Sequence, residues 1–153
     1  MQILIGNQFQ WNDGVWSIAL SRTKPNGFKT AFFHPLGSSS EFSVPTEVLR
    51  NETLASRRTH GQDFKFIGHR GPNSNSGSHA VDLNTNVMFF AEMQNNAVSC
   101  WNLKKDLKRT NMDIVQQNNL TLIYPSDLTV SIIRGIFRTP SPFDRKLSSI
   151  FEK

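Results

Sequence analysis

The side chains best suited to chemistry in this chain are four histidines and a single cysteine. The histidines show no spacing typical of metal ligands, and no paired carboxylate accompanies them: His34, His60, His69 and His79. Ser78, His79 and Asp82 supply the residue types of a hydrolytic triad, but no nucleophile-elbow motif surrounds the serine. We therefore expect neither a metal nor a cofactor, and histidines placed in loops or at strand ends.

Cys100 lies in an apolar segment with Val98 and Trp101. A thiol in such a segment is a core thiol or a half-cystine more readily than a nucleophile, and one cysteine cannot form an internal disulfide. Trp101 and Trp16 are expected to be core aromatics.

The charge balance is basic, with a net charge of +5 and a sequence pI near 9.7. The basic residues are scattered apart from one run, residues 104–109, which is most simply a solvated loop between strands. Nucleic-acid binding would need such a run on a helix or beside stacking aromatics, so we expect no nucleic-acid partner. No apolar stretch approaches the length of a membrane span, and we expect no membrane association.

Short apolar or aromatic runs alternate with Gly, Asn, Pro and Ser, which is typical of successive β-hairpins and indicates an all-β fold. Residues 45–50 are expected to form a helical turn and residues 50–62 a surface loop. Three units of similar pattern start near Asp13, His79 and Asp127, at separations that fit either propeller blades or a β-sandwich. The predicted strands are 15–20, 28–34, 41–44, 63–67, 79–83, 87–93, 97–101, 112–115, 128–133 and 136–138.

Four motifs carry a resemblance to a known family: Phe32-Phe33-His34-Pro35-Leu36, Arg70-Gly71-Pro72-Asn73-Ser74, Ala97-Val98-Ser99-Cys100-Trp101-Asn102 and Tyr124-Pro125-Ser126-Asp127-Leu128. In order and spacing, from about Trp11 to Asp127, the chain resembles the C-terminal half of the yellow / major royal jelly protein family of insects. That family's fold is a six-bladed β-propeller. The resemblance implies that residues 1–153 form one partial propeller of two to three blades, with residues 134–153 as a divergent tail.

The resemblance also implies several structural properties. Arg70 should anchor the loop of residues 68–78 through backbone carbonyl groups. The cysteine equivalent to Cys100 normally pairs with a later cysteine, which this sequence lacks. Part of a ring exposes blade edges and apolar surface, so we expect self-association of the isolated chain.

Ligands of propellers usually lie in the central channel, which the first residues of the innermost strands line. Some family members bind amines such as serotonin or catecholamines there. By that resemblance Asp127 offers a carboxylate to an ammonium group, Ser126 a hydroxyl, and Phe143 (or Phe137) a ring face. The alternative is that Ser126 and Asp127 bond only the local backbone of a turn.

The leading hypothesis for function is therefore a secreted, non-enzymatic binder of small aromatic amines. Conversion of dopachrome is the alternative within the same family, with His79 or Asp127 as the base, and a degenerate product without independent function is a third. The sequence shows no signal peptide, so an extracellular location rests on the resemblance. Two sequons, at Asn51 and Asn119, predict N-glycosylation.

Overall fold

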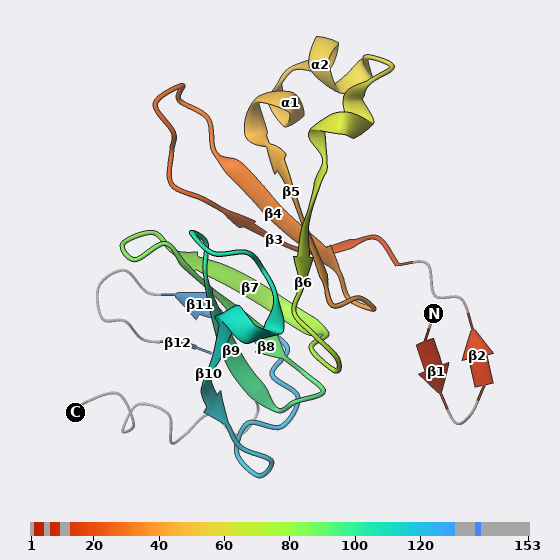
Figure 1. Cartoon of the computed structure of the whole chain (residues 1–153), viewed down its shortest axis with the longest axis vertical. Coiled ribbons are helices and arrows are strands. Elements are labelled where there is room, and N and C mark those ends of the chain that lie inside the picture. Colours follow the sequence, from red (N-terminus) through yellow and green to blue (C-terminus); the bar gives the residue numbers. More distant parts are fainter. Residues whose placement is uncertain (1, 5–6, 10–12, 131–136, 139–153) are drawn as a thin grey trace.

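Two four-stranded antiparallel sheets form most of the computed structural model, which is described for residues 2–4, 7–9, 13–130 and 137–138 (Figure 1). Blade 1 contains β3 (Val15–Leu20), β4 (Thr30–Pro35), β5 (Ser40–Pro45) and β6 (Lys65–His69). Blade 2 contains β7 (Ser76–Asp82), β8 (Val87–Glu92), β9 (Ala97–Asn102) and β10 (Met112–Gln117). In each sheet every strand pairs with the next one along the chain, which is the meander of a propeller blade.

Turn residues set the boundaries of these strands. Asn86 and Asn96, in the two tight hairpins of blade 2, have φ of 58° and 47°, and Gly27 between β3 and β4 has φ of 81°. Glycine and asparagine tolerate this left-handed conformation better than other residues. The Gly and Asn residues between the apolar runs therefore form the turns of the meander.

Two short hairpins flank the blades. β1 (Gln2–Leu4) pairs with β2 (Asn7–Phe9), and β11 (Thr129–Val130) pairs with β12 (Phe137–Arg138). β11 contacts β7, the first strand of blade 2, whereas the β1–β2 hairpin lies to one side of blade 1 (Figure 1).

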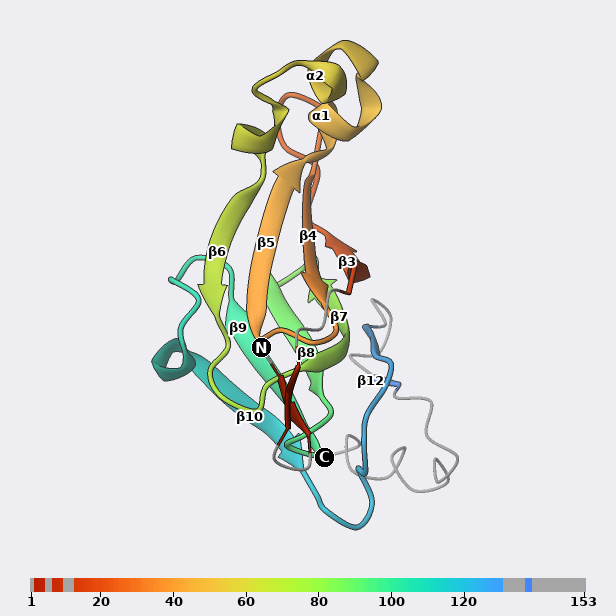
Figure 2. The same ribbon diagram turned by 90° about the vertical axis from the view of Figure 1, so that its right-hand side faces the viewer.

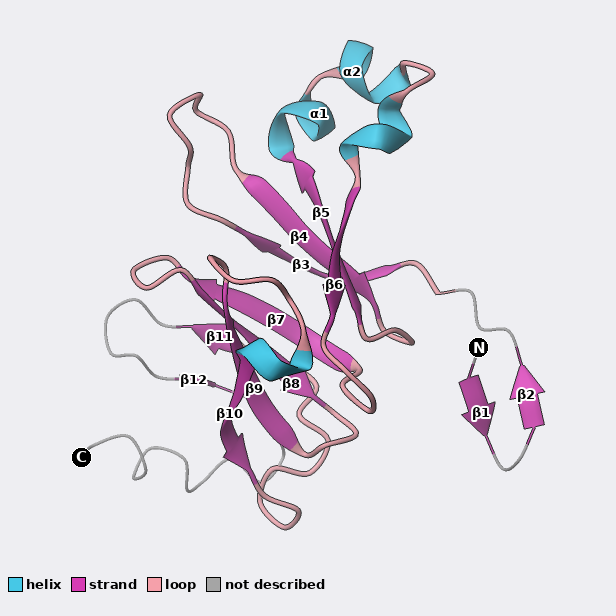
Figure 3. Ribbon diagram, in the orientation of Figure 1, coloured by secondary structure: helices cyan, strands magenta, loops and turns pink. Residues whose placement is uncertain are grey.

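The helices are short and lie mainly at one end of blade 1 (Figure 3). They are α1 (Thr46–Arg50), α2 (Glu52–Ser56) and the 3-10 turns η1 (His60–Asp63) and η2 (Arg109–Asn111). The segment 50–62, expected to be a surface loop, does lie at the surface but contains α2 and most of η1; Asn51 caps α2 by accepting a hydrogen bond from the Leu54 N–H. None of the described helices is long and apolar enough to cross a bilayer.

The main core lies between the two blades, which stack face to face (Figure 2). Phe32 of blade 1 packs there with Phe90 and Trp101 of blade 2, and Met88, Leu107 and Met112 complete the cluster. A smaller core, with Val98 and Leu128 at its centre, forms where β11 covers the other face of blade 2. The expectation that Trp101 is a core aromatic is confirmed by its 3% exposure.

The described residues cover the other face of blade 1 only in part: Val48 of α1 packs there against Ala31 and Val44. Trp16 and Ile18 of β3 are 61% and 63% exposed, and Phe66 of β6 is 55% exposed. The expectation that Trp16 is a core residue is therefore wrong in this chain, since no described strand packs over that face of β3. The fold is the all-β, partial propeller that the sequence predicted.

Candidate functional site

The innermost strands are β3, β7 and β11, which lie side by side at the inner edge of the blades. β7 and the segment before β11 approach closely at Gly77. A Cβ atom on Gly77 would lie 2.6 Å from the Ser126 carbonyl oxygen, so no larger residue fits without movement. Glycine here lets residues 126–127 lie against the start of β7, at the edge that would line a propeller channel.

Ser126 and Asp127 are both exposed at this edge. Asp127 Oδ1 accepts a hydrogen bond of 2.7 Å from the Leu128 N–H, so its side chain takes part in the local turn. Tyr124 is 59% exposed and has φ of 52°, with its N–H bonded to Asn96 Oδ1. The Asp127 carboxylate keeps a second oxygen for solvent or a ligand. Phe143 lies outside the described residues, and the side chain of Phe137 is not described.

His79 does not reach this edge with its side chain, which is fully buried between the blades. Its Nδ1 lies 2.7 Å from Ser17 Oγ of β3, and its Nε2 lies 3.3 Å from Glu41 Oε1 of β5. Glu41 Oε1 and His79 Nε2 are buried, and neither makes a hydrogen bond with the described residues apart from this 3.3 Å ion-pair contact. This pattern favours the tautomer in which Nε2–H faces the carboxylate and the Ser17 hydroxyl donates to Nδ1.

Glu41 is the centre of a buried cluster that also contains His34, Arg70 and His79, called here the interblade cluster. Glu41 Oε2 accepts a hydrogen bond of 2.8 Å from Arg70 Nη1 and lies 3.0 Å from His34 Nδ1. The Phe90 ring packs beneath the cluster, with the Arg70 guanidinium carbon 5.0 Å from its centroid and the His79 ring stacked on it. A buried carboxylate is stable only when paired and hydrogen-bonded, and both conditions are met here.

The neighbours of His34 place one proton between His34 and Glu41. His34 Nε2 lies 3.1 Å from the Ser76 carbonyl, which can only accept, so Nε2 carries a hydrogen. Nδ1 faces Glu41 Oε2, so a proton must lie between these two atoms. Burial lowers the pKa of His34, and the hydrogen bond with Glu41 opposes that shift. Burial also raises the pKa of Glu41, but the hydrogen bonds with His34 and His79 and their charges outweigh it and lower the pKa to about 2.

The donor set of His34, Glu41 and His79 is one that binds divalent metals, and the three ligand atoms lie within 4.8 Å of one another. The position of Arg70 argues against a metal, because its guanidinium occupies Glu41 Oε2 and would repel a cation. The cluster is better described as an ion pair with two histidines that joins β4, β5, β7 and the loop after β6.

Arg70 anchors its loop through backbone carbonyls, as predicted. Its Nε donates to the Ser74 carbonyl at 3.1 Å, and Nη2 donates to the Ser38 carbonyl at 2.8 Å. A second buried carboxylate, Glu92 of β8, accepts from Ser99 Oγ, from Asn95 Nδ2 at 2.6 Å and from Arg109 Nη1 at 3.0 Å. Polar networks therefore fix both the contact between the blades and the interior of blade 2.

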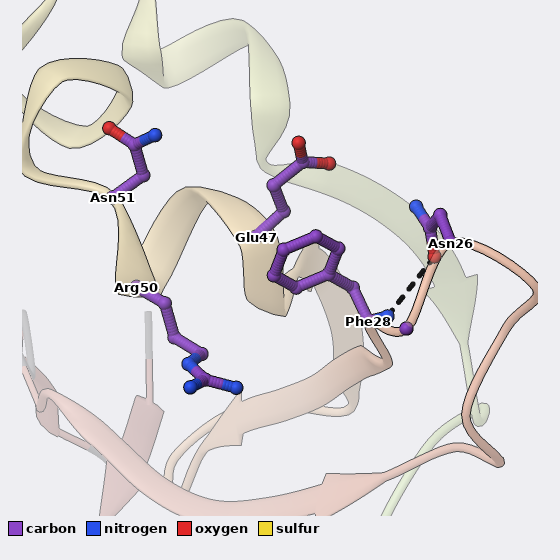
Figure 4. Close-up of a pocket in the computed structure, with 6 residues that line it drawn as sticks. Asn26, Phe28, Glu47, Arg50 and Asn51 are labelled. Carbon is purple, nitrogen blue, oxygen red and sulfur yellow. Dashed lines mark hydrogen bonds between the residues drawn. The ribbon is translucent and has the colours of Figure 1, made fainter.

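An open pocket of about 400 Å³ lies away from this cluster, between the β3–β4 turn and α1 (Figure 4). Phe28, Glu47 and Arg50 line it, and Asn26 Oδ1 accepts a hydrogen bond from the Phe28 N–H. Asn51 of the first sequon also lines this pocket and is exposed, as is Asn119 of the second. Glycosylation at both stays a prediction.

Sequence spacing missed the interblade cluster because its members are distant in sequence. His34 and Glu41 lie on adjacent strands joined by a short turn, so a buried His–carboxylate pair across a hairpin was a readable signal. The contribution of His79 required knowing that β7 packs against β3. The roles of His79 and Asp127 as bases, and of Ser126 as a ligand contact, stay predictions.

Comparison with known proteins supplies the context for this geometry. The family model described as Major royal jelly protein matches residues 2–136. L-dopachrome tautomerase yellow-f of Drosophila melanogaster is 44% identical over 125 residues, which is 82% of this chain and 29% of the relative. Protein yellow of the same species is 32% identical over 133 residues, 86% of this chain and 24% of the relative. The chain thus spans less than a third of these curated relatives.

Proposed function

The chain belongs to the major royal jelly protein family, and on this basis we propose that it forms part of a propeller channel in which L-dopachrome is tautomerised. The observation that carries the proposal is the 44% identity to a relative named L-dopachrome tautomerase yellow-f, over 82% of this chain. Because of this identity, we propose tautomerisation first and amine binding second.

A tautomerase moves a proton within its substrate without net oxidation. A base removes a proton from carbon, the electron pair shifts toward an oxygen or nitrogen, and a proton is delivered there. The base must reach the substrate, so an exposed carboxylate or imidazole beside the channel is required. Asp127 meets this requirement, since it is exposed beside the start of β7.

His79 is less suited to this step, although it lies on the same inner strand. Its side chain is fully buried, and Ser17 and Glu41 face its two ring nitrogens. We assign it a positioning role, in which it fixes β3 against β7 and so sets the width of the channel edge.

The substitution Asp127→Asn separates the two roles of Asp127. Asparagine keeps an oxygen that accepts from the Leu128 N–H but cannot act as a base at neutral pH. We expect the rate of L-dopachrome loss to fall by about 100-fold or more, in the range of a lost general base, with an unchanged melting temperature. His79→Ala should instead lower the melting temperature. An Asp127→Asn protein with full activity would remove Asp127 as the base.

A second candidate function is binding of a small aromatic amine without catalysis. The exposed Asp127 carboxylate, with the Ser126 hydroxyl and the exposed Tyr124 ring next to it in sequence, offers the groups that an arylethylamine requires. Titration calorimetry with serotonin, dopamine and octopamine tests this function. Absence of heat with all three would reject it.

An extracellular location is part of the proposal. The exposure of Asn51 and Asn119 supports it, because glycan addition occurs in the secretory pathway. When the chain is secreted from insect cells behind an added signal peptide, glycosidase treatment should lower its mass by two glycans. Asn51→Gln and Asn119→Gln should each remove one of them. A chain without glycan would contradict this part of the proposal.

A further inference from the structure

We propose that Ser17 is an activated nucleophile, with His79 as its base and Glu41 as the group that orients the base. The three residues come from β3, β7 and β5 and meet between the blades. Ser17 Oγ lies 2.7 Å from His79 Nδ1, and His79 Nε2 lies 3.3 Å from Glu41 Oε1. A hydroxyl bonded to an imidazole whose other nitrogen faces a buried carboxylate is the arrangement of a Ser-His-acid triad, which occurs on unrelated folds and is identified by its geometry.

The protonation states of the three residues suit these roles. Burial raises the pKa of Glu41, but the hydrogen bonds with His34 and His79 and their charges outweigh it and lower the pKa to about 2, so Glu41 is ionised at neutral pH. The Nε2–H of His79 then faces a negative charge, and Nδ1 is left to accept the hydroxyl proton of Ser17. The main-chain N–H of His79 also donates to Ser17 Oγ, at 3.2 Å. This donor would stabilise the negative charge that forms on the oxygen as its proton leaves.

The proposed role also accounts for two buried atoms of the interblade cluster. Glu41 Oε1 and His79 Nε2 are fully buried, yet neither makes a hydrogen bond of good geometry with the described residues. Such atoms are rare in native proteins, and catalytic sites are among the places where they occur. Hydrogen bonds of catalytic groups are often long without substrate and shorten when charge develops. Transfer of the Ser17 proton to His79 creates that charge, because it places an imidazolium opposite the carboxylate.

The serine and aspartate that are close to His79 in the sequence do not explain this site. Asp82 accepts hydrogen bonds from the Asn84 N–H and the Thr85 hydroxyl in its own turn, at 2.8 Å and 2.7 Å. Ser17 is 62 residues away from His79 in sequence, and the packing of β3 against β7 brings the two together. Ser17 is half-buried, whereas the side chains of His79 and Glu41 are fully buried. The serine is therefore the member of the group that a substrate can reach.

The reaction class that fits these three groups is acyl transfer from a small carboxylic ester. Ser17 Oγ forms a bond to the carbonyl carbon, the ester C–O bond breaks, and the hydroxyl proton passes to His79 Nδ1 and then to the leaving alcohol. Water then releases the acid, with His79 again taking the proton, and the serine is restored. This activity is independent of the proposed tautomerase function, because it removes no proton from carbon and does not use Asp127.

Labelling with a biotinylated fluorophosphonate tests the proposal, since this reagent modifies serines that a neighbouring base activates. A bond forms between the serine oxygen and phosphorus while fluoride leaves, and peptide mass spectrometry identifies the modified serine. We expect labelling of Ser17 in the folded chain and none after heat unfolding. A folded chain that stays unlabelled, or that carries the label on another residue, would overturn the proposal.

Ser17→Ala and Ser21→Ala form a matched pair of variants. Both serines are half-buried, but Ser21 Oγ donates to the Arg22 carbonyl instead of to an imidazole. Ser17→Ala should lose the labelling and Ser21→Ala should keep it, with both chains folded by circular dichroism. His79→Gln should lower the labelling rate by about 100-fold or more, in the range of a lost general base. Equal rates for His79→Gln and the wild-type chain would contradict the proposal, and the wild-type and Ser17→Ala results decide the question if that variant does not fold.

Discussion

Glu41 holds together segments that are far apart in the sequence. It contacts His34 on the neighbouring strand, Arg70 in the loop after β6 and His79 on blade 2. Replacing it by glutamine keeps the shape but leaves the Arg70 cation without its buried counter-charge. Since removing one partner of a buried ion pair costs about 3–5 kcal/mol, we expect Glu41→Gln to lower the free energy of unfolding by that amount.

Urea unfolding measures this loss, with Glu47→Gln as the control. Glu47 is exposed on α1, and its substitution should change stability by no more than about 0.5 kcal/mol. Equal stability of the Glu41→Gln and wild-type chains would show that the cluster contributes nothing.

The lowered pKa of Glu41 predicts how stability depends on pH. As pH falls below 4.5 the unfolded chain binds a proton at this carboxyl first, so the unfolded state is favoured. The stability from Glu41 is complete above pH 4.5 and is lost as pH falls toward about 2, by about 3 kcal/mol in total.

The urea midpoint measured between pH 2 and pH 7 tests this expectation. The wild-type midpoint should fall steeply between pH 4.5 and pH 2, and the Glu41→Gln midpoint should fall less. Parallel curves for the two chains would contradict the assignment of the shift to Glu41.

For individual residues, the sequence predicted only the contacts that form within one sequence motif. The anchoring by Arg70 follows from a loop of small residues beside one arginine, and the hydrogen bonds confirm it. The assembly of Glu41 with His79 could not be predicted, because it depends on how the two blades pack.

The alternation of apolar runs with Gly, Asn, Pro and Ser predicted the central strands well. The expected strand 15–20 is β3, and the expected strands 87–93 and 97–101 correspond closely to β8 and β9. Helix α2 was missed because five residues are too few for a periodic pattern, and its start depends on the Asn51 cap. Local residue types determine the strands and turns, whereas long-range packing determines which faces of the two blades contact each other.

The close contact between β7 and the segment before β11 predicts that a larger residue at Gly77 will separate them. In Gly77→Ala the added Cβ would meet the Ser126 carbonyl oxygen at 2.6 Å and push residues 126–128 away from β7. We expect a loss of roughly 1–3 kcal/mol, as for an overpacked core, and faster amide exchange in residues 128–130. Gly14→Ala is the control, since nothing lies within 4 Å of its added Cβ. Unchanged exchange in Gly77→Ala would show that this contact does not hold β11.

In the whole molecule, two blades share one apolar core and a buried ion cluster, and the inner strands β3, β7 and β11 form one edge. Trp16 is 61% exposed, and its apolar strand pattern could not reveal this, because the pattern does not show whether another strand packs over that face. The proposed channel is complete only when the ring is closed.

The rate of L-dopachrome loss in the presence of the purified, folded chain tests the proposed function most directly. The folded chain should accelerate the loss saturably over buffer and over the same chain after heat unfolding, and the product should be an isomer of equal mass. A chain that is folded yet gives the buffer rate would contradict the proposed tautomerase function.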